Sequence, residues 1–446
     1  MKHLIIAGWH TDNNKGDQAI LISLLNKINE NLCDVKYYVQ LGLHYRHPHY
    51  PYMLIDTSSI LGDYDIKALT SIFPYCPSKS LFYKHIFYLY YFIRSIFILI
   101  CPQVLGKLLL TKVEYNDIKV YFYCDLLVAK GGHYLYNGKD LSSIFSLYQQ
   151  AYPFFLAKRL RLDYYLISIS IGPFNYIIGK VIALILLINA KAISVREQLS
   201  YYIACGLLKG RREISLSCDL ALSLTLRDVN ENVKSTKDSM SILGNGYFIV
   251  CPRAFFPGDK NNYNYRKYIH IMEEIIMELS FRNRERILIL LNSKPKNTDK
   301  TLVDDDEHFV TKIKADLRSC DNIYFMDKDL NLWQMLDIYN KGKLVIGTRL
   351  HSLLFAVLAA VPFVGISYNN IKFSIFDGLG LGNYVFSVNS IQKNVIINAI
   401  DDILRDRGII MDKIIGARKK AQVLISSDRA LNMLIERLRI TNEKPI

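Results

Sequence analysis

Short, fully apolar segments alternate with segments of helical periodicity along most of this chain, and this alternation limits the folds that it can adopt. Residues 3–9, HLIIAGW, have the pattern of a buried strand, and residues 17–32 follow with apolar side chains at helical spacing. A strand that is apolar at every position must be covered on both faces, as in a parallel sheet whose crossovers are helices. The sequence therefore predicts an α/β fold with a doubly wound parallel sheet.

The alternation occurs twice, which predicts two domains. The chain has 446 residues, more than one hydrophobic core ordinarily organises. A polar segment closed by glycines, residues 227–246, separates the two series and is typical of a linker. We therefore expect Rossmann-like domains at 1–226 and 247–446 that face a cleft, with C-terminal helices packing back.

Charge and cysteine usage narrow the classes of partner and compartment. A formal net charge of +14 suits phosphorylated small molecules, anionic lipid head groups or nucleic acid. The basic residues are spread along the chain without a recognition motif, which excludes nucleic acid. The eight cysteines form no C-x-x-C pair and mostly lie in apolar segments, which predicts buried free thiols in a reducing compartment. The apolar segment at the N-terminus is too short for a signal peptide, so we expect a cytoplasmic protein.

An aromatic-rich insertion at about 70–110 interrupts the first series of elements. Its uninterrupted apolar segments, 86–93 and 95–101, are divided by Arg94. Both are shorter than the roughly 20 residues that cross a bilayer. The insertion predicts buried or lid-forming helices, and the alternative is a helix that lies on a membrane surface.

Polar or glycine-rich residues follow several predicted strands, at the ends where parallel sheets bind ligands. In the turn within residues 10–20, Gly16 permits close backbone approach, and Asp17 can cap the helix that follows. The dinucleotide signature GxGxxG is absent, so no nicotinamide cofactor is expected. The candidate binding residues in these turns are Asn14, Gly16 and Asp17 in segment 10–20, and Gly131, Gly132 and His133 in segment 129–138.

The segment SVRE, residues 194–197, has the spacing of a helix capping box. Ser194 and Glu197 would then cap a helix, which places Arg196 in its first turn. A guanidinium group in that position can pair with a carboxylate or a phosphate. The alternative is a solvated surface arginine.

The segment VIGTRLHSLLF, residues 345–355, places a cation and a histidine at the start of an apolar helix. With Thr348 as the predicted N-cap, Arg349 and His351 lie in the first turn. A cation is unfavourable at this end of the helix dipole, so we expect a ligand anion nearby. The alternatives are a hydrogen-bonded core histidine and an arginine that pairs at a domain interface.

Two further segments carry polar or acidic side chains, and the first concerns the same predicted cleft. Tyr368, Asn369 and Lys372 follow the next strand and could line it. The acidic segment DDDE, residues 304–307, is predicted to cap the helix that follows. We expect no metal site there, because adjacent carboxylates do not converge on one side.

These motifs, in this order, resemble those of the polysaccharide pyruvyl transferase family. The matching segments are NKGDQAI, KGG, SIGP, SVRE, Asp219 and IGTRLHSLLFAVLAAVPFVGISY followed by IKF. The resemblance implies a GT-B-like architecture and transfer of pyruvate from phosphoenolpyruvate onto a sugar, as a ketal, in bacterial surface-polysaccharide biosynthesis. The loop YNNIK departs from the family pattern Tyr-Asp-x-Lys by Asn369 and by one additional residue before Lys372.

The resemblance also implies roles for particular residues. Arg196, Arg349 and His351 would hold the donor's carboxylate and phosphate, with His351 either as the acid or as a phosphate ligand. Neither a cofactor nor a metal ion is expected. The acceptor would be a saccharide, lipid-linked or nucleotide-activated, with peripheral contact at the inner face of the cell membrane. The alternatives are a GT-B glycosyltransferase that uses a nucleotide sugar and a non-catalytic, glycan-binding member of the family.

Overall fold

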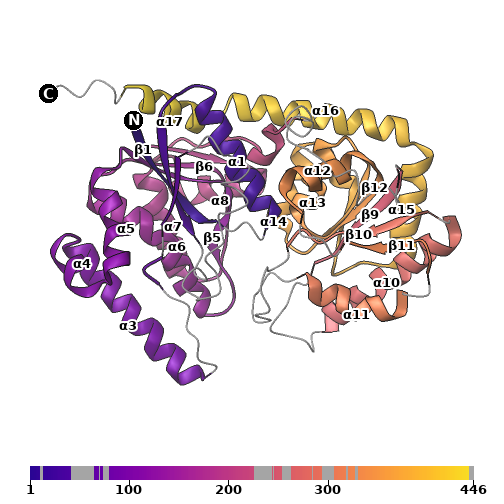
Figure 1. The fold of residues 1–446 in the computed structure, drawn as a ribbon, viewed down its shortest axis with the longest axis horizontal. Helices are drawn as coiled ribbons and strands as arrows, with labels where there is room; N and C mark the ends of the chain where they lie inside the picture. The colour runs from indigo at the N-terminus through magenta and orange to yellow at the C-terminus, as the bar shows by residue number, and fades with distance from the viewer. Residues whose placement is uncertain are drawn as a thin grey trace. The chain divides into compact units, whose positions relative to one another are not determined.

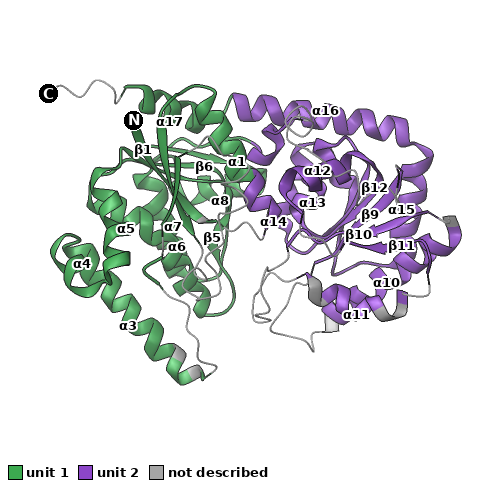
Figure 2. Ribbon diagram, in the orientation of Figure 1, with its two compact units in different colours: residues 1–12, 20–217, 427–446 green, residues 13–19, 218–426 purple. Residues whose placement is uncertain are grey.

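The computed structural model divides the chain into two compact units. It describes residues 1–10, 14–41, 65–69, 71–73, 80–225, 244, 246–253, 263–283, 285–293, 306–317, 320–326 and 330–440. Unit 1 comprises residues 1–12, 20–217 and 427–446, and unit 2 comprises residues 13–19 and 218–426 (Figure 2).

Unit 1 is built on an eight-stranded parallel sheet in the order β3-β2-β1-β4-β6-β7-β8, with β5 paired to β6 (Figure 1). Its strands are β1 (Lys2–His10), β2 (Val35–Leu41), β3 (Asp65–Leu69), β4 (Leu126–Ala129), β5 (Gly132–Asn137), β6 (Tyr164–Phe174), β7 (Ala192–Val195) and β8 (Ser215–Leu216). Its helices are α1 (Lys15–Asn29, whose first turn belongs to unit 2), α3 (Leu81–Ile100), α4 (Val104–Leu109), α5 (Lys112–Tyr123), α6 (Ser142–Arg159), α7 (Ile177–Asn189), α8 (Gln198–Leu208) and α17 (Arg429–Ile440).

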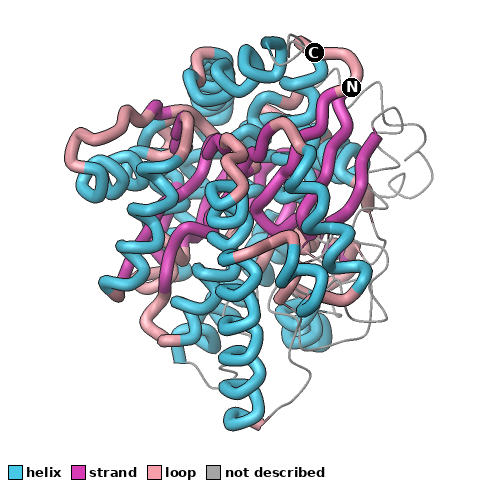
Figure 3. Tube along the Cα trace, turned by 90° about the vertical axis from the view of Figure 1, so that its left-hand side faces the viewer, coloured by secondary structure: helices cyan, strands magenta, loops and turns pink. Residues whose placement is uncertain are grey.

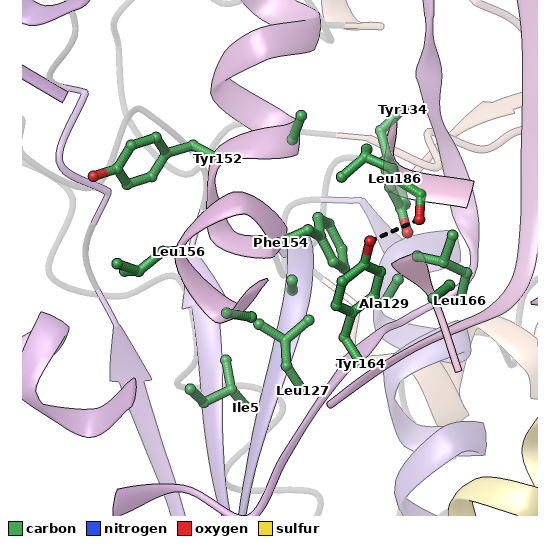
Figure 4. Close-up of a cluster of buried hydrophobic side chains, with 14 of the residues drawn as sticks. Ile5, Leu127, Ala129, Tyr134, Tyr152, Phe154, Leu156, Tyr164, Leu166 and Leu186 are labelled. Atoms are coloured by element: carbon green, nitrogen blue, oxygen red, sulfur yellow. Dashed lines mark hydrogen bonds between the residues drawn. The ribbon is translucent and has the colours of Figure 1, made fainter. Parts of the chain in front are cut away.

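Consecutive residues of the central strands are buried, as the fully apolar strand pattern predicts. Leu4, Ile5 and Ile6 in β1 are all 0% exposed, which requires cover on both faces of the sheet. Figure 4 shows part of the core on the face that Ile5 lines, where side chains of α6 and α7 meet those of β4 and β6. There the hydroxyl of Tyr164 donates to the carbonyl of Leu186 at 2.7 Å, which satisfies a buried polar group.

Unit 2 contains a six-stranded parallel sheet in the order β11-β10-β9-β12-β13-β14. Its strands are β9 (Tyr247–Cys251), β10 (Ile287–Ile289), β11 (Ile323–Phe325), β12 (Gly342–Gly347), β13 (Phe363–Ser367) and β14 (Val385–Ser387). Its helices are α10 (Tyr263–Asn283), α11 (Glu307–Leu317), α12 (Leu332–Asn340), α13 (Leu350–Leu358), α14 (Asn370–Gly378), α15 (Lys393–Arg405) and α16 (Arg407–Ser426), with short 3₁₀ helices η2 (Leu220–Ser223) and η3 (Gly382–Tyr384).

The strand order of unit 2 reverses between β9 and β12, the point at which doubly wound sheets bind ligands. The corresponding point in unit 1 lies between β1 and β4. Parallel strands with helical crossovers in both units confirm the predicted α/β class.

The division of the chain departs from the predicted boundaries at three places. Unit 2 takes up the chain again at Cys218, inside the predicted first domain 1–226, and of the predicted linker 227–246 only Gly244 and Gly246 lie within the described residues. Residues 13–19 belong to unit 2, where the amide of Lys15 donates to the carbonyl of Asn292 at 3.2 Å. The C-terminal segment from residue 427, which includes α17, belongs to unit 1, whereas the predicted second domain extended to residue 446.

Helix α17 joins unit 1 because its apolar side completes the cover of that sheet. It contacts β6 and β7, and Ala430 and Leu434 are fully buried. Asp428, just before the helix, accepts a hydrogen bond from the hydroxyl of Ser194 at 2.6 Å and from the amide of Ala430 at 2.9 Å. Burial raises the pKa of this carboxyl group above its ordinary value.

The aromatic-rich insertion forms α3, α4 and α5, while residues 74–79 lie outside the described residues. Pro102 follows the end of α3, and Thr111 and Glu114 form a capping box at the start of α5. Among the helices that the structure describes, none is long and apolar enough to span a bilayer.

Candidate functional site

In unit 2, the candidate site is built at the ends of β9 and β12. The amide of Thr348 donates to the carbonyl of Cys251 at 2.9 Å, which joins the two strand ends. Helix α13 begins directly after, with Arg349 at the N-cap position and no side-chain capping bond. The predicted N-cap, Thr348, is wrong because its hydroxyl is engaged with that of Tyr268 at 2.8 Å.

Arg349 is paired with a carboxylate inside unit 2. Its Nε and Nη2 atoms donate to the two oxygens of Asp306 at 2.5 and 2.8 Å. The two side chains are 7% and 0% exposed, so this bidentate ion pair is shielded from water. The anion expected beside Arg349 is therefore supplied by Asp306. That Arg349 also contacts a ligand stays a prediction.

His351 lies between two helix starts and a carboxylate. Its Nε2 atom is 3.6 Å from Oδ2 of Asp219, the N-cap of η2, and has no hydrogen-bond partner among the described residues. Its Nδ1 atom lies over Gly16 in the first turn of α1, where a Cβ atom would come within 2.1 Å. Only glycine allows this approach, as the sequence predicts for the turn. The alternative of a hydrogen-bonded core histidine does not describe this ring, whose side chain is 15% exposed.

The first turn of α1 is attached to unit 2 by backbone bonds. Asn14 pairs with Ser293 in an antiparallel bridge, and its side chain accepts the amide of Gly16 at 3.0 Å. Asn14 thus provides the capping bond that the sequence assigned to Asp17, which lies in the first turn. The N-termini of α1 and α13 both present their positive dipole ends near His351, an arrangement that favours an anion.

Tyr368, which directly follows β13, has two cations near its ring. The guanidinium of Arg253 is 4.1 Å from the centre of its ring, and Nζ of Lys372 is 6.0 Å away. Asn369 caps α14 by accepting the amide of Lys372 at 3.1 Å. Arg253 follows β9 and was not predicted as a site residue, although its position after a buried strand was a usable signal.

Cys251 also lies at the end of β9, but its thiol is a poor nucleophile. The residue is fully buried, and burial raises the pKa of its thiol to about 12. The thiol is therefore protonated near neutral pH.

In unit 1, Arg196 is buried rather than solvated. It is 3% exposed, and its Nε atom donates to Ser170 at 2.7 Å and to Glu197 at 3.2 Å. Helix α8 begins at Gln198, so Arg196 precedes the helix, and the predicted capping box is wrong. Glu197 instead accepts the hydroxyl of Ser200 at 2.6 Å. The hydroxyl of Ser194 bonds to Asp428, 234 residues away.

The predicted glycine turn lies after β4 in unit 1. Gly132 has a φ of +130°, and a Cβ atom on Gly131 would come 2.9 Å from the carbonyl of Ser168. His133 donates from Nε2 to the carbonyl of Gly172 at 2.6 Å and stacks on Tyr136. These contacts account for both glycines as backbone requirements.

Lys130 and His10 meet at the point where the strand order of unit 1 reverses. Lys130 is 1% exposed, and its Nζ atom lies 3.3 Å from Nδ1 of His10. A buried lysine at a strand end is a further candidate ligand group in unit 1.

The structure thus assembles the predicted residues in two groups. Unit 1 holds Arg196, Gly131, Gly132 and His133, and unit 2 holds Asn14, Gly16, Asp17, Arg349, His351, Tyr368 and Lys372. Within unit 2, Gly16 and His351 are in contact, and Asp219 and Asp306 complete the surroundings of His351 and Arg349. The predicted joint role of Arg196 and Arg349 concerns residues of different units and stays a prediction.

Comparison with solved structures shows the same fold at low sequence identity. The structure of Staphylococcus aureus MnaA with UDP has a TM-score of 0.58 and 13% identity, covering 100% of this chain and 99% of that one. UDP-GlcNAc 2-epimerase from Neisseria meningitidis, bound to UDP-GlcNAc, has a TM-score of 0.54 and 12% identity, covering 99% and 100%. These similarities confirm the GT-B-like fold.

Comparison of sequences shows the family. General stress protein 30 of Bacillus subtilis (strain 168) is 25% identical over 183 residues, which are 38% of this chain and 53% of that protein. The match therefore spans about half the length of that relative. The family model for polysaccharide pyruvyl transferase matches residues 14–370, from the Asn14 turn through His351 to the loop after β13. The chain belongs to the polysaccharide pyruvyl transferase family.

Proposed function

We propose that this protein transfers pyruvate from phosphoenolpyruvate to a saccharide, forming a cyclic ketal in bacterial surface-polysaccharide biosynthesis. The observation that carries the proposal is the position of His351. Its Nε2 atom has no hydrogen-bond partner among the residues described, and the starts of α1 and α13 lie beside it. An acid–base group next to a site for an anion is what a phosphorylated enol donor requires.

The proposed reaction needs one proton donor and a site for the departing phosphate. A proton is added to C3 of phosphoenolpyruvate, and one sugar hydroxyl attacks C2. A second hydroxyl then displaces inorganic phosphate from C2, which closes the ketal. One of the two hydroxyl protons replaces the proton given to C3, and the other leaves with the phosphate.

We assign His351 to the proton transfer, because imidazole gives and takes protons near neutral pH. Asp219 acts as a positioning residue, since its carboxylate faces Nε2 at 3.6 Å and is itself held by the amide of Ala221 at 3.0 Å. A phosphate bound at the starts of α1 and α13 would be stabilised by backbone amides without a metal ion.

The remaining predicted residues have roles in binding. Arg349 is proposed as a donor contact and Tyr368 and Lys372 as substrate contacts, with Arg253 added from the structure. In unit 1, Arg196 is proposed to contact the donor anion, and the turn of Gly131, Gly132 and His133 to contact the acceptor. The acceptor is proposed to be lipid-linked, with the enzyme acting in the cytoplasm at the inner face of the membrane.

The test compares donors. The melting temperature of the purified chain is measured with phosphoenolpyruvate and with UDP-sugars, since a ligand that binds the native state raises it. Phosphate release is then measured with saccharide acceptors. We expect phosphoenolpyruvate to stabilise the protein and to release phosphate only with an acceptor. Stabilisation by UDP-sugars, with release of UDP, would instead indicate a glycosyltransferase.

A histidine pair provides the matched control. His351→Asn is expected to lower kcat by roughly 100-fold or more, in line with the usual contribution of an acid–base group. His270→Asn changes a side chain that is 72% exposed on α10 and is expected to leave kcat unchanged. Equal activity of the two variants would overturn the assignment of His351.

A further inference from the structure

Helix α3 exposes an apolar face along its whole length. The exposed large side chains recur every three or four residues, which places them on one side of the helix. We call them the outer face of α3; each is between 39% and 77% exposed. They are Phe82, Tyr83, Ile86, Leu89, Tyr90, Ile93, Ile96, Phe97 and Ile100.

Two polar side chains of α3, Arg94 and Ser95, are buried on the opposite side of the helix. Arg94 is 7% exposed and donates to Glu114 at 3.0 Å and to the carbonyl of Ile72 at 2.5 Å. Ser95 is fully buried, with its hydroxyl 2.8 Å from that of Tyr148. Because these contacts hold the inner side of α3 against α5 and α6, the outer face cannot turn inward without breaking them.

The exposed charged side chains of α4 and α5, of which α4 contacts both α3 and α5, have one sign. Lys107 on α4 and Lys112 and Lys119 on α5 are exposed. The carboxylates within residues 80–123 are those of Glu114 and Asp117, and both are buried. The same two helices also expose Val104, Leu108 and Val113, at 57%, 72% and 62% exposure. An apolar face bordered by uncompensated lysines is complementary to a membrane surface with anionic head groups.

We propose that the outer face of α3, together with Lys107, Lys112 and Lys119, docks on a membrane that contains anionic phospholipid. Helix α3 lies along the interface, because no helix that the structure describes could span a bilayer. Its tyrosine and phenylalanine rings enter the boundary between head groups and acyl chains, where aromatic side chains are favoured. In Figures 1 and 3, α3 extends away from the rest of unit 1 as a rod.

The lysines favour lipid over a second copy of this chain as the occupant. A symmetric dimer through the outer face would bring Lys107, Lys112 and Lys119 of both copies to the same interface. Like charges at an interface are unfavourable, whereas anionic head groups neutralise them. The proposal stands independently of the reaction proposed above.

The experiment measures binding of the full chain to vesicles by co-sedimentation. Vesicles of phosphatidylcholine with phosphatidylglycerol are compared with vesicles of phosphatidylcholine alone. We expect tighter binding to the anionic vesicles, and weaker binding as salt is added. Equal binding to both vesicle types would overturn the electrostatic part of the proposal, and no binding to either would overturn it entirely.

Two variants separate the apolar and ionic contributions. Leu89→Ser combined with Ile93→Ser changes exposed residues and is expected to weaken binding by roughly 100-fold, since each large apolar side chain contributes about tenfold or more. Replacing Lys107, Lys112 and Lys119 by glutamine is expected to weaken binding to anionic vesicles by roughly 100-fold at low salt.

The matched control is Ile409→Ser, which changes an isoleucine 63% exposed on α16 and is expected to bind like the wild type. Wild-type binding by the α3 double variant would overturn the proposal. So would a dimer, detected by light scattering, that dissociates in this variant while vesicle binding is unchanged. Phosphate release with a water-soluble acceptor is measured on the same samples, so a failure of docking is distinguished from a failure of the proposed reaction.

Discussion

Removing the guanidinium of Arg349 is expected to destabilise unit 2, whatever its effect on catalysis. Arg349→Ala leaves the carboxylate of Asp306 without its bidentate partner, in a site where the aspartate side chain is 0% exposed. Breaking a buried ion pair on one side typically costs about 3–5 kcal/mol, because an uncompensated charge remains. Since domains are stable by roughly 5–15 kcal/mol, this is a large part of the total.

The prediction has a second component in the reverse substitution. Asp306→Ala leaves Arg349 buried without its carboxylate and is expected to destabilise by a similar amount. The double variant, Arg349→Ala with Asp306→Ala, removes both charges. Its loss of stability is expected to be smaller than the sum of the losses in the two single variants. The difference, the coupling energy, should be at least about 1 kcal/mol, as for contacting residues in one network.

The assay is unfolding in urea, monitored by tryptophan fluorescence. The chain has two tryptophans, Trp9 and Trp333, and Trp333 is buried in α12 of unit 2. In a Trp9→Phe background the signal therefore reports on unit 2 alone. Arg405→Ala, which removes an exposed pair with Asp402, serves as the control and should leave the midpoint unchanged.

Two results would refute this reasoning. One is an Arg349→Ala midpoint equal to that of the wild type, and the other is a double variant whose loss equals the sum of the single losses. If the prediction holds, loss of turnover in Arg349→Ala does not by itself indicate contact with a donor. Such a test requires conditions in which the variant is shown to be folded.

Three further predictions concern His351, its neighbours and the buried thiol. Gly16→Ala places a Cβ atom within 2.1 Å of Nδ1 of His351, so the imidazole ring must move. We therefore expect kcat to fall about 100-fold. The control is Gly416→Ala, whose Cβ atom would have no neighbour within 4 Å and which should leave kcat unchanged. Asp219→Asn keeps the size of the side chain but removes the charge that faces His351. We expect kcat to fall tenfold or more, the pH profile of kcat to move, and KM to change less. If Asp219 had a purely structural role, the pH profile would stay unchanged. Cys251 should resist iodoacetamide at about pH 8 in the native protein while the exposed Cys33 reacts, as read by peptide mass spectrometry, because burial raises the pKa of the Cys251 thiol to about 12. The same raised pKa predicts that the free energy of unfolding falls as pH rises from the ordinary thiol pKa of 9.0 toward about 12, because the thiol ionises first in the unfolded chain. Modification of Cys251 in the native protein at a rate like that of Cys33 would contradict the raised pKa on which both expectations depend.

The positions of the site residues at strand ends could be predicted because they depend on local pattern. Arg349 and His351 follow a buried strand and precede an apolar helix, and the structure places them between β12 and α13. Gly16 was predicted as a point of close approach, and the ring of His351 lies over it. What approaches Gly16 could not be read from the sequence, because the two residues are far apart along the chain.

The capping motifs show where local pattern was insufficient. Ser194 and Glu197 have the spacing of a capping box, yet the structure gives them different partners, Asp428 and Ser200. A hydroxyl or carboxylate forms whichever hydrogen bond the tertiary packing provides, so spacing alone could not choose. Thr348 is the same case, since its hydroxyl meets Tyr268 rather than a helix amide.

The sequence by itself determined the α/β class, the family and the strand ends that carry the predicted site residues. The class and the strand ends could be recognised because strands buried on both faces are apolar at nearly every residue. Only the tertiary structure decided which charges balance one another. Asp306 lies 43 residues from Arg349, and Asp219 faces His351 from a separate turn. It also assigned α17 to the first unit and turned the apolar side of α3 outward. These outcomes depend on packing between distant segments, where the cost of a buried unpaired charge or polar group selects the partner.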